Sequence, residues 1–305
     1  MQDVVVVGGS FAGLTAALQL GRTGRAVTII DAQAPRNRLS PAAHGVPGFD
    51  GMAPGDILQR FRSDATAYPT VSVVTETVAM ITGEADRFEV SLASGETLQA
   101  RRILLTHGVV DVRPNLPGAQ DAWGKVLLHC PYCHGYEVRD QPLAVLANHA
   151  MSGHQAQLLR ADWSDDVTLL TGGPGTFDQT DVQSGDLKTD PRTVIALTPL
   201  NDGISVTFDS GEVTWFAAMF TAPLVSLSGT PADSLGCAVL HGPLGPFIHV
   251  GPMGQTSIPG VFAAGDCARA AHNVTSAIGD GSMAGIGCHQ SLVFPDFIQP
   301  IEAAA

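Results

Sequence analysis

The 305-residue sequence is short of charge, of long apolar runs and of cysteine. Charged residues form only 15% of it and hydrophobic residues 45%, a balance that favours a well-packed globular protein of about two domains. No apolar run approaches the roughly 18 residues needed to cross a bilayer, so we do not expect a membrane protein. A strand-like pattern begins within three residues of Met1 and leaves no room for a secretion signal, which predicts a cytoplasmic protein.

Basic residues are scarce as well, with 16 Lys and Arg against 29 Asp and Glu and a formal net charge of -13. Neutralising nucleic-acid phosphates needs clustered cations, so this balance argues against a nucleic-acid ligand. It also disfavours a strongly acidic protein partner. Five cysteines are too few for a disulfide scaffold in a chain of this length, and one close pair then indicates catalysis or a metal.

The close pair is Cys130-Pro-Tyr-Cys133, followed directly by His134. Two cysteines at this spacing can close a small disulfide ring, and a neighbouring base can hold one as the thiolate that attacks another disulfide. The same spacing forms half of a zinc site, with His129 as a further possible ligand. No second CxxC exists in the chain, which favours the redox pair and predicts no metal. The remaining cysteines are expected to be buried and apolar in character: Cys237, Cys267 and Cys288.

The opening of the chain predicts a strand, a glycine turn and a helix. Residues 4 to 7 are four valines, typical of a buried parallel strand, and GGSFAG follows at residues 8 to 13. This matches the dinucleotide fingerprint except at Ser10; Gly8 permits the tight turn, and Gly13 lets helix and strand approach. The helix N-terminus would then face a pyrophosphate. Asp31 ends the next strand, where a carboxylate accepts from ribose hydroxyls.

Three later stretches favour FAD as the nucleotide. LLTHG, at residues 104 to 108, provides a glycine-containing turn after a strand. TSIPGVFAAGDC, at residues 256 to 267, places Asp266 where it can bond a ribityl hydroxyl, although an ordinary helix cap is the alternative for Asp266 alone. HNVTSAIGDG, at residues 272 to 281, begins a helix whose N-terminus can stabilise charge at the flavin N1–C2 carbonyl locus. The predicted cofactor-binding residues are Gly8, Ser10, Phe11, Ala12, Gly13, Asp31, Thr106, Gly108, Gly265, Asp266, Asn273 and Val274.

The middle of the chain repeats the pattern of the first part. A second strand-helix-strand pattern covers residues 142 to 173, and FEVSLASGE at residues 88 to 96 aligns with ISVTFDSGE at residues 204 to 212. Generic hairpin chemistry could give this match, but its coincidence with two βαβ units favours duplicated nucleotide-binding domains. The predicted fold is α/β, with two Rossmann-like domains of three-layer ββα type, the second inserted in the first.

The domain boundaries follow from the Gly- and Pro-containing stretches. Linkers are expected at residues 111 to 121 and 224 to 245. The FAD-binding domain is predicted to comprise residues 1–112 and 242–305. Residues 113–241 then form the inserted pyridine-nucleotide-type domain, which carries the CxxC.

In order and spacing these motifs resemble those of the low-molecular-weight thioredoxin reductases, and they do so over essentially the whole chain. The order is a glycine fingerprint, an acidic strand end, a Thr-x-Gly turn, a CxxC and a GVFAAGD segment. The resemblance implies FAD in the split domain, a redox disulfide at the start of the inserted one, and a homodimer. It further implies that Cys133 faces flavin C4a and that Cys130 exchanges with the substrate disulfide.

Three histidines are candidates beside this disulfide or the cofactor. The resembled family commonly has an acid after the second cysteine, where this chain has His134. A histidine there can hold the proton released as the thiolate forms, although a hydrogen bond to nearby backbone is the alternative. The resembled proteins place the loop around His44 near the isoalloxazine, so His44 is a further candidate beside an ordinary surface role. His107 is expected to pack or to line the cofactor edge rather than to catalyse.

The second nucleotide site departs from the family pattern. Ala147, Asn148 and His149 stand where a glycine-rich turn is expected, and side chains there crowd a pyrophosphate. The next strand ends in VTLLTGGPGTF, at residues 167 to 177, without the basic cluster that NADPH-dependent members use for the 2′-phosphate. We therefore expect this domain to persist as a scaffold and NADPH not to be the electron donor.

The sequence thus favours an FAD-dependent dithiol/disulfide oxidoreductase whose direction stays open. In one form a donor such as ferredoxin supplies electrons, and the dithiol reduces a thioredoxin-like protein or a small disulfide. In another, a small dithiol reduces the disulfide, then flavin, then oxygen, as in the gliotoxin and holomycin dithiol oxidases, whose CP-aromatic-CHG motif is matched by CPYCHG. A conventional NADPH-thioredoxin reductase with an atypical site and a non-catalytic flavin redox sensor are the remaining alternatives.

Overall fold

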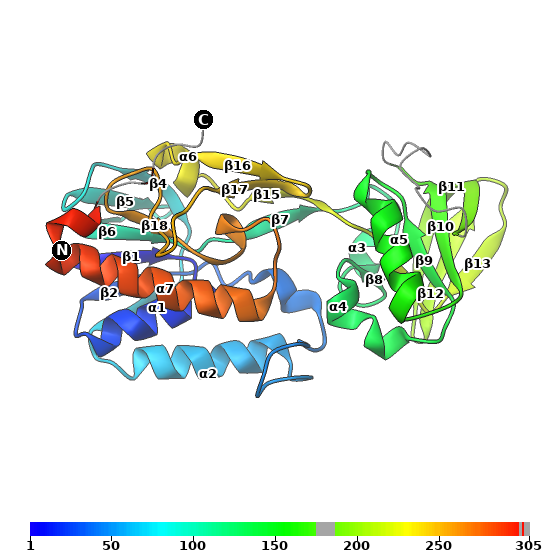
Figure 1. Ribbon diagram of the computed structural model, residues 1–305, viewed down its shortest axis with the longest axis horizontal. Coiled ribbons are helices and arrows are strands. Elements are labelled where there is room, and N and C mark those ends of the chain that lie inside the picture. Colours follow the sequence, from blue (N-terminus) through cyan, green and yellow to red (C-terminus); the bar gives the residue numbers. More distant parts are fainter. Residues whose placement is uncertain (175–186, 299–300, 302–305) are drawn as a thin grey trace. The chain divides into compact units, whose positions relative to one another are not determined.

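The computed structural model describes residues 1–174, 187–298 and 301, and the chain divides into two compact units (Figure 1). Unit 1 comprises Met1–Arg38, Pro54–Val110 and Val225–Ala305. Unit 2 comprises Leu39–Ala53 and Asp111–Leu224, so it is inserted in unit 1 and also takes a short segment from the first part of the chain. Among the helices of the described residues, none combines the length and the apolar character needed to cross a bilayer.

Unit 1 is built on a mixed sheet with the strand order β3-β2-β1-β6-β5-β4, in which β18 also pairs with β6. The three strands β1, β2 and β3 are parallel, as are β1 with β6 and β6 with β18, whereas β4, β5 and β6 form an antiparallel meander. Parallel neighbours put their carboxyl ends at one edge, where nucleotides bind in folds of this kind. The strands are β1 (Gln2–Val7), β2 (Val27–Ile30), β3 (Val71–Val74), β4 (Val78–Thr82), β5 (Phe88–Leu92), β6 (Thr97–Leu105) and β18 (Val261–Ala263).

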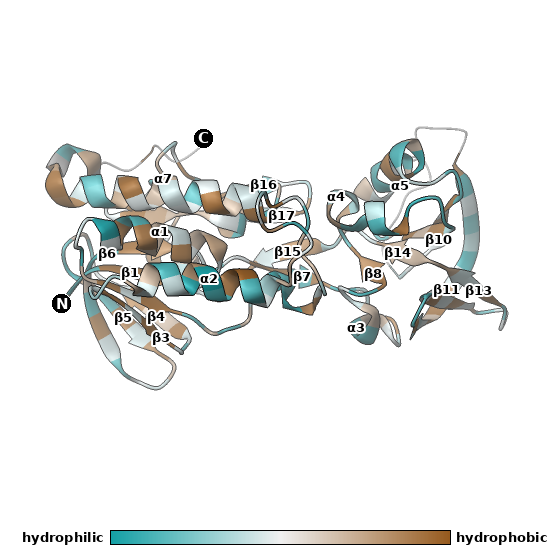
Figure 2. Ribbon diagram, turned by 90° about the horizontal axis from the view of Figure 1, so that it is seen from below, coloured by the Kyte–Doolittle hydropathy of each residue, from teal (hydrophilic) through white to brown (hydrophobic). Residues whose placement is uncertain are grey.

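Helix α1 lies between α7 and α2 in unit 1 (Figures 1 and 2). Figure 2 shows alternating teal and brown bands along α2, the pattern of a helix with one buried and one solvated face. The helical segments of unit 1 are α1 (Phe11–Arg22), α2 (Pro54–Thr66), α6 (Pro231–Leu235), α7 (Val274–Val293), η4 (Gly265–Ala268) and η5 (Pro295–Ile298), with η1 (Arg36–Leu39) ending at the boundary.

Unit 2 repeats this architecture with the strand order β13-β12-β11-β10-β9-β14-β8. Its strands β8, β14, β9, β10 and β11 run parallel to their neighbours, and β11, β12 and β13 are antiparallel. The strands are β8 (Leu127–Leu128), β9 (Leu143–Leu146), β10 (Val167–Gly172), β11 (Lys188–Leu200), β12 (Gly203–Phe208), β13 (Val213–Phe216) and β14 (Ala218–Phe220). The helical segments are α3 (Ala119–Ala122), α4 (Pro131–His134), η2 (Tyr136–Val138) and α5 (Met151–Asp162).

The internal repeat therefore lies in the same context in both units. The Gly95-Glu96 turn joins β5 to β6, and the Gly211-Glu212 turn joins β12 to β13. Both glycines adopt positive φ, +91° and +84°, which a side chain would oppose. The α/β fold with two Rossmann-like units is confirmed. The sequence did not predict strand β4. Two of its exposed positions carry the apolar residues Ala79 and Met80, which hide the alternation of polar and apolar residues expected of a strand.

The return linker expected at residues 224 to 245 was wrong, because most of that stretch is folded. It contains β15 (Leu224–Leu227), which pairs with β7 (Val109–Val112), and β16 (Val239–Gly242), which pairs with β17 (Gly245–Ile248). The units divide at 110/111 and 224/225, whereas the sequence predicts boundaries at 112/113 and 241/242. Gly and Pro serve here as turn residues between short strands rather than as a flexible connection.

Two small residues of α7 let it approach α1 closely. A Cβ at Gly281 would lie 2.2 Å from the carbonyl oxygen of Ala12, and one at Gly285 would lie 2.9 Å from that of Ala16. Gly279, on the same helix, has open space at its Cβ position. The α1–α7 contact fixes the two helix N-termini that the predicted flavin site uses.

Gly281→Ala should lower the free energy of unfolding by about 1–3 kcal/mol, because α7 must move away from the Ala12 carbonyl. Gly279→Ala is the matched control and should raise it by up to about 1 kcal/mol through helix propensity alone. Urea unfolding followed by circular dichroism measures both. Equal stability of the two variants would show that the helices are not in close contact.

Candidate active site

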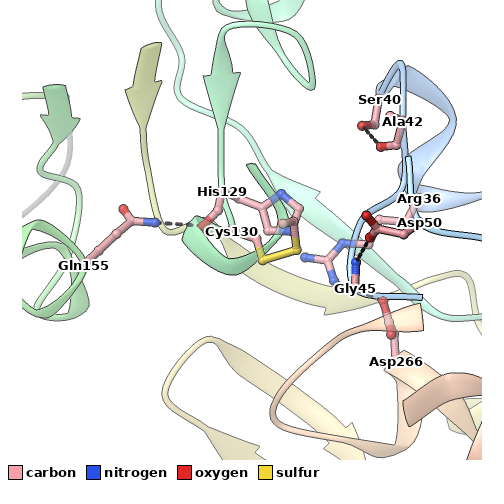
Figure 3. The surroundings of a disulfide bond; sticks show 10 residues. Arg36, Ser40, Ala42, Gly45, Asp50, His129, Cys130, Gln155 and Asp266 are labelled. Carbon is pink, nitrogen blue, oxygen red and sulfur yellow. Dashed lines mark hydrogen bonds and ion pairs between the residues drawn. A yellow bond between two sulfur atoms is a disulfide. The ribbon is translucent and has the colours of Figure 1, made fainter. Parts of the chain in front are cut away.

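Cys130 and Cys133 are joined by a disulfide within a single helical turn (Figure 3). Cys130 is the N-cap of α4, and Pro131 occupies the first helical position, where its fixed φ is already helical. The Cys133 N–H donates to the Cys130 carbonyl at 3.2 Å, and the two Cα atoms are 5.2 Å apart. The CxxC spacing thus places both sulfur atoms on one turn, which can open and close without moving a strand.

Side chains from the rest of unit 2 fix this turn on two sides. Gln155 of α5 donates from Nε2 to the carbonyl oxygen of His129 at 2.7 Å (Figure 3). The His129 ring stacks on Trp123 with centroids 6.1 Å apart. Tyr132 packs edge-on against Trp163 at 5.5 Å. Sequence reasoning missed Gln155 and both tryptophans, because no spacing rule links them to the cysteines.

His134 is partly buried directly after Cys133, and its pKa is lowered from the usual value of 6.5. Burial is the main cause and disfavours the imidazolium; the Glu137 carboxylate raises the pKa, and His44 lowers it. At neutral pH the ring is therefore neutral and able to accept a proton. His44 belongs to the Leu39–Ala53 segment of unit 2, the unit that also carries the disulfide.

The predicted phosphate turn of unit 1 has the required shape. Gly8 adopts φ +107°, and a Cβ there would lie 2.4 Å from the Thr106 carbonyl oxygen. A Cβ at Gly13 would lie 1.9 Å from the Gly8 carbonyl oxygen, so only glycine fits where β1 meets α1. Ser10, the N-cap of α1, gives no side-chain hydrogen bond to the first turn, which begins with Phe11 and Ala12. The N–H groups of that turn stay available to an anion.

Two predicted carboxylates lie at the carboxyl-end edge of the unit 1 sheet, each paired with an arginine. Asp31 accepts from Arg62 at 2.7 Å, and Asp266 accepts from Arg36 at 3.1 Å. A Cβ at Gly9 would lie 2.7 Å from the Asp31 side chain, so Asp31 borders the phosphate turn. Sequence reasoning did not select the two arginines, because their partners lie far away along the chain.

The other predicted cofactor residues of unit 1 occupy the same edge of the sheet. The Thr106 hydroxyl lies 3.0 Å from the Val7 carbonyl oxygen and 2.8 Å from that of Gly8, and it can donate to either. This contact holds the glycine turn in place. Gly265 lies against Ala12, because a Cβ on Gly265 would lie 2.9 Å from the Cβ of Ala12. Asn273 caps α7, and its side-chain oxygen accepts from the Ser276 N–H at 2.7 Å. Two predicted residues flank these contacts: Gly108 accepts from Ser228, and Val274 begins α7.

His107 is a buried imidazole in the turn after β6. Neither ring nitrogen has a hydrogen-bond partner within normal geometric limits. Burial lowers its pKa to about 4, and weak interactions with the backbone of Gly108 and Ser228 and with the Asp233 charge offset only part of that cost. Its neutral state agrees with a packing residue, as expected, rather than with a proton carrier at neutral pH.

Three cysteines outside the disulfide are buried thiols, as expected. Burial raises the pKa of Cys237 to about 11 and those of Cys267 and Cys288 to about 12. Thiols at such values stay protonated and poorly nucleophilic near neutral pH. Within the described residues, no group of three or more His, Cys, Asp and Glu has an arrangement that could hold a metal ion.

The turn between β9 and α5 in unit 2 is closed by its own side chains. Ser152 Oγ accepts from the N–H groups of Asn148 at 3.1 Å and His149 at 3.4 Å, and His149 Nδ1 accepts from the Met151 N–H at 3.2 Å. The Asn148 amide donates to the Ala222 carbonyl at 2.9 Å, and His149 Nε2 lies 2.5 Å from the same oxygen. Three N–H groups of this turn, those of Asn148, His149 and Met151, are therefore already bonded to side chains of the turn itself.

The backbone of that turn also differs from its counterpart in unit 1. Ala147 does not adopt the positive φ that Gly8 has at the equivalent strand end. Gly173, at the end of β10, packs against it, since a Cβ there would lie 2.2 Å from the Ala147 carbonyl oxygen. The rest of the predicted 2′-phosphate stretch, residues 175 to 177, lies outside the described residues.

Two Rossmann-like units and a CxxC disulfide on the second define a disulfide oxidoreductase that uses a nucleotide cofactor. Comparison with known proteins agrees. The family model described as pyridine nucleotide-disulphide oxidoreductase matches residues 2–162. A thioredoxin reductase, tcpT of Claviceps purpurea (strain 20.1), is 34% identical over 298 residues, which cover 93% of this chain and 92% of the relative.

Two solved structures are similar over nearly the whole chain. An oxidoreductase from Agrobacterium tumefaciens has a TM-score of 0.89 and 37% identity, and the match covers 96% of this chain and 99% of that one. HlmI has a TM-score of 0.88 and 36% identity, with 97% and 93% covered. The chain belongs to the pyridine nucleotide-disulphide oxidoreductase family and is a thioredoxin reductase-like flavoprotein. Membership makes it an oxidoreductase enzyme and implies a flavin cofactor.

His107 should make stability depend on pH, because its folded pKa lies below the unfolded one. In the unfolded chain His107 is protonated below about pH 6.5, whereas in the folded chain it is protonated only below about pH 4. Stability is therefore full above pH 6.5 and falls by up to about 3 kcal/mol as the pH drops toward 4. In His107→Leu this part of the slope should vanish in urea unfolding. The exposed His154, changed to Leu, is the control and should keep the wild-type slope.

Proposed function

We propose that this chain is an FAD-dependent dithiol/disulfide oxidoreductase that exchanges electrons between flavin and substrate through Cys130 and Cys133, and that NADPH is not its donor. The observation that carries the second part is the closed turn before α5. In that turn Ser152 and His149 accept the N–H groups that a pyrophosphate would need. Opening it for a nucleotide would cost these bonds and those to Ala222, each worth about 1 kcal/mol.

FAD fits the residues of unit 1. The uncapped N-terminus of α1 and the Gly8–Gly13 turn suit a pyrophosphate. Asp31 suits the adenine-side ribose, and Asp266 suits a ribityl hydroxyl. The N-terminus of α7, beginning at Val274, would stabilise negative charge on the flavin ring. When bound, the flavin supplies a two-electron acceptor or donor for the dithiol.

The chain's own residues perform the thiol exchange. In the oxidising direction, a substrate thiolate attacks Sγ of Cys130 and the Cys130–Cys133 bond breaks, leaving a mixed disulfide and a Cys133 thiolate. The second substrate thiol then displaces Cys130, which completes the substrate disulfide and leaves the protein dithiol. His134 accepts the proton that this second thiol loses. The reducing direction reverses these steps, with Cys130 as the attacking thiol and Cys133 as the resolving one.

The partner is accordingly a dithiol or a disulfide, either a thioredoxin-like protein or a small molecule. In the reducing direction, a non-pyridine donor such as ferredoxin would supply the electrons. One observation favours the oxidising direction as a second candidate: Cys130-Pro-Tyr-Cys133-His134-Gly135 matches the motif shared by gliotoxin and holomycin dithiol oxidases. In that direction oxygen would take the two electrons and form hydrogen peroxide.

Anaerobic stopped-flow reduction of the holoprotein tests the proposal. Dithiothreitol should bleach the flavin within seconds, whereas NADPH and NADH at 100 µM (about the middle of the usual range for enzyme substrates) should leave it oxidised. Rapid bleaching by either pyridine nucleotide would make the chain a conventional NADPH-dependent reductase. Reduced ferredoxin is included as the alternative donor.

Cys133→Ser is the control variant for the dithiol route. It should retain FAD, detected after denaturation, but lose bleaching by dithiothreitol. Full reduction in this variant would remove the disulfide from the electron path. Admitting air to the reduced wild type with excess dithiol then decides direction, since sustained hydrogen peroxide formation supports the oxidase form. Steady turnover with any acceptor would count against a pure redox sensor.

A further inference from the structure

The loop around His44 is separated from the rest of unit 2 in sequence but folds with it. Leu39, at the start of the Leu39–Ala53 segment, packs against the core that includes Trp123, and a Cβ on Gly124 would lie 3.0 Å from Leu39 Cβ. The loop closes on itself through an antiparallel bridge between Ala43 and Met52. His44 is therefore held by an ordered loop on the unit that carries the disulfide.

Both ring nitrogens of His44 face carboxylates. Nε2 lies 3.5 Å from Oε1 of Glu137, and Nδ1 lies 3.7 Å from Oδ1 of Asp50. The Asp50 carboxylate is fixed by accepting the Gly45 N–H at 2.7 Å (Figure 3). Glu137 lies in η2, three residues after His134. His44 thus bridges a carboxylate beside the redox turn and a carboxylate in its own loop.

The groups around His44 differ in their exposure to solvent, and Asp50 is the most exposed of them. The side chain of His44 is 22% exposed, that of Glu137 42% and that of Asp50 68%. Among the described residues, the charged groups that act on His134 are Glu137 and His44, and those paired with His44 are Glu137 and Asp50. His134, Glu137 and His44 therefore lie within electrostatic range of one another, and the Asp50 carboxylate paired with His44 is open to solvent.

Thiol exchange releases a proton whenever a thiol becomes a thiolate. His134 is partly buried, so a proton that it takes from a thiol must leave before the next turnover. Both distances at His44 are longer than a hydrogen bond, but catalytic contacts of this kind often shorten only when substrate is bound.

We propose that Glu137 and His44 form a proton relay between His134 and solvent, a role that rests on the proposed dithiol chemistry. The His134 imidazolium gives its proton to the Glu137 carboxylate. Glu137 passes it to Nε2 of His44, and His44 releases a proton from Nδ1 toward Asp50 and water. Each group ends the transfer in its starting charge, and no electrons move. In the reducing direction, in which a substrate disulfide is reduced, the same path carries the proton inward.

His44→Gln and Glu137→Gln test the relay against His154→Gln, an exposed histidine of the same unit. Each relay variant should slow bleaching of the flavin by dithiothreitol about tenfold, less than the roughly hundredfold cost of losing a direct general base. Added imidazole should restore the rate in His44→Gln. His154→Gln should match the wild type. Wild-type rates in both relay variants would overturn the relay.

The pH dependence gives a second readout that does not depend on the flavin. Alkylation of the reduced protein by iodoacetamide reports the thiolate as His134 titrates. The Glu137 carboxylate raises the pKa of His134, so its loss should shift the acid limb of the alkylation rate profile to lower pH. His44 lowers that pKa, so its loss should shift the same limb to higher pH. Identical profiles in both variants would overturn the relay.

These two measurements separate the relay from the function beneath it. If dithiothreitol fails to bleach the wild-type flavin, the proposed function fails, while opposite shifts of the alkylation profile would still support the relay. If bleaching occurs but neither variant slows it, the relay fails and the dithiol function stands.

Discussion

The proposed electron supply depends on the hydrogen bonds in the turn between β9 and α5. A helix N-terminus offers a few N–H groups, and they can bind either a phosphate or the chain's own side chains. In unit 1 the N-terminus of α1 has no side-chain cap and meets a glycine turn. In unit 2 the N–H groups of Asn148, His149 and Met151 are bonded to the side chains of Ser152 and His149. The same architecture thus carries one open and one closed nucleotide turn.

Helix α5 keeps a function although its turn is closed. Through Gln155 it holds the carbonyl of His129, directly before Cys130, and so fixes the start of the redox turn. A second Rossmann-like unit therefore remains useful as the support of the disulfide. Under the proposed function, unit 2 is retained as a scaffold without a site for a pyridine nucleotide.

Much of the fold and part of the site could be predicted from the sequence. The Val4–Val7 strand, the Gly8 turn and the CxxC are local patterns, and local patterns determine strands, turns and a disulfide between near neighbours. The pairing of Asp266 with Arg36 and the membership of His44 in unit 2 depend on the tertiary fold, which no spacing rule gives. The boundary at 224/225 was missed because Gly- and Pro-containing hairpins read as a linker. The cofactor roles of individual residues, the compartment and the dimer stay predictions.

We propose that unit 2 has no working site for a pyridine nucleotide, and an equilibrium binding measurement can decide this. Calorimetric titration of the oxidised holoprotein with NADPH measures binding whether or not electrons move. We expect no saturable heat up to millimolar NADPH, because N–H groups of the turn before α5 are already bonded. Saturable binding of one NADPH per chain in the micromolar range would contradict it.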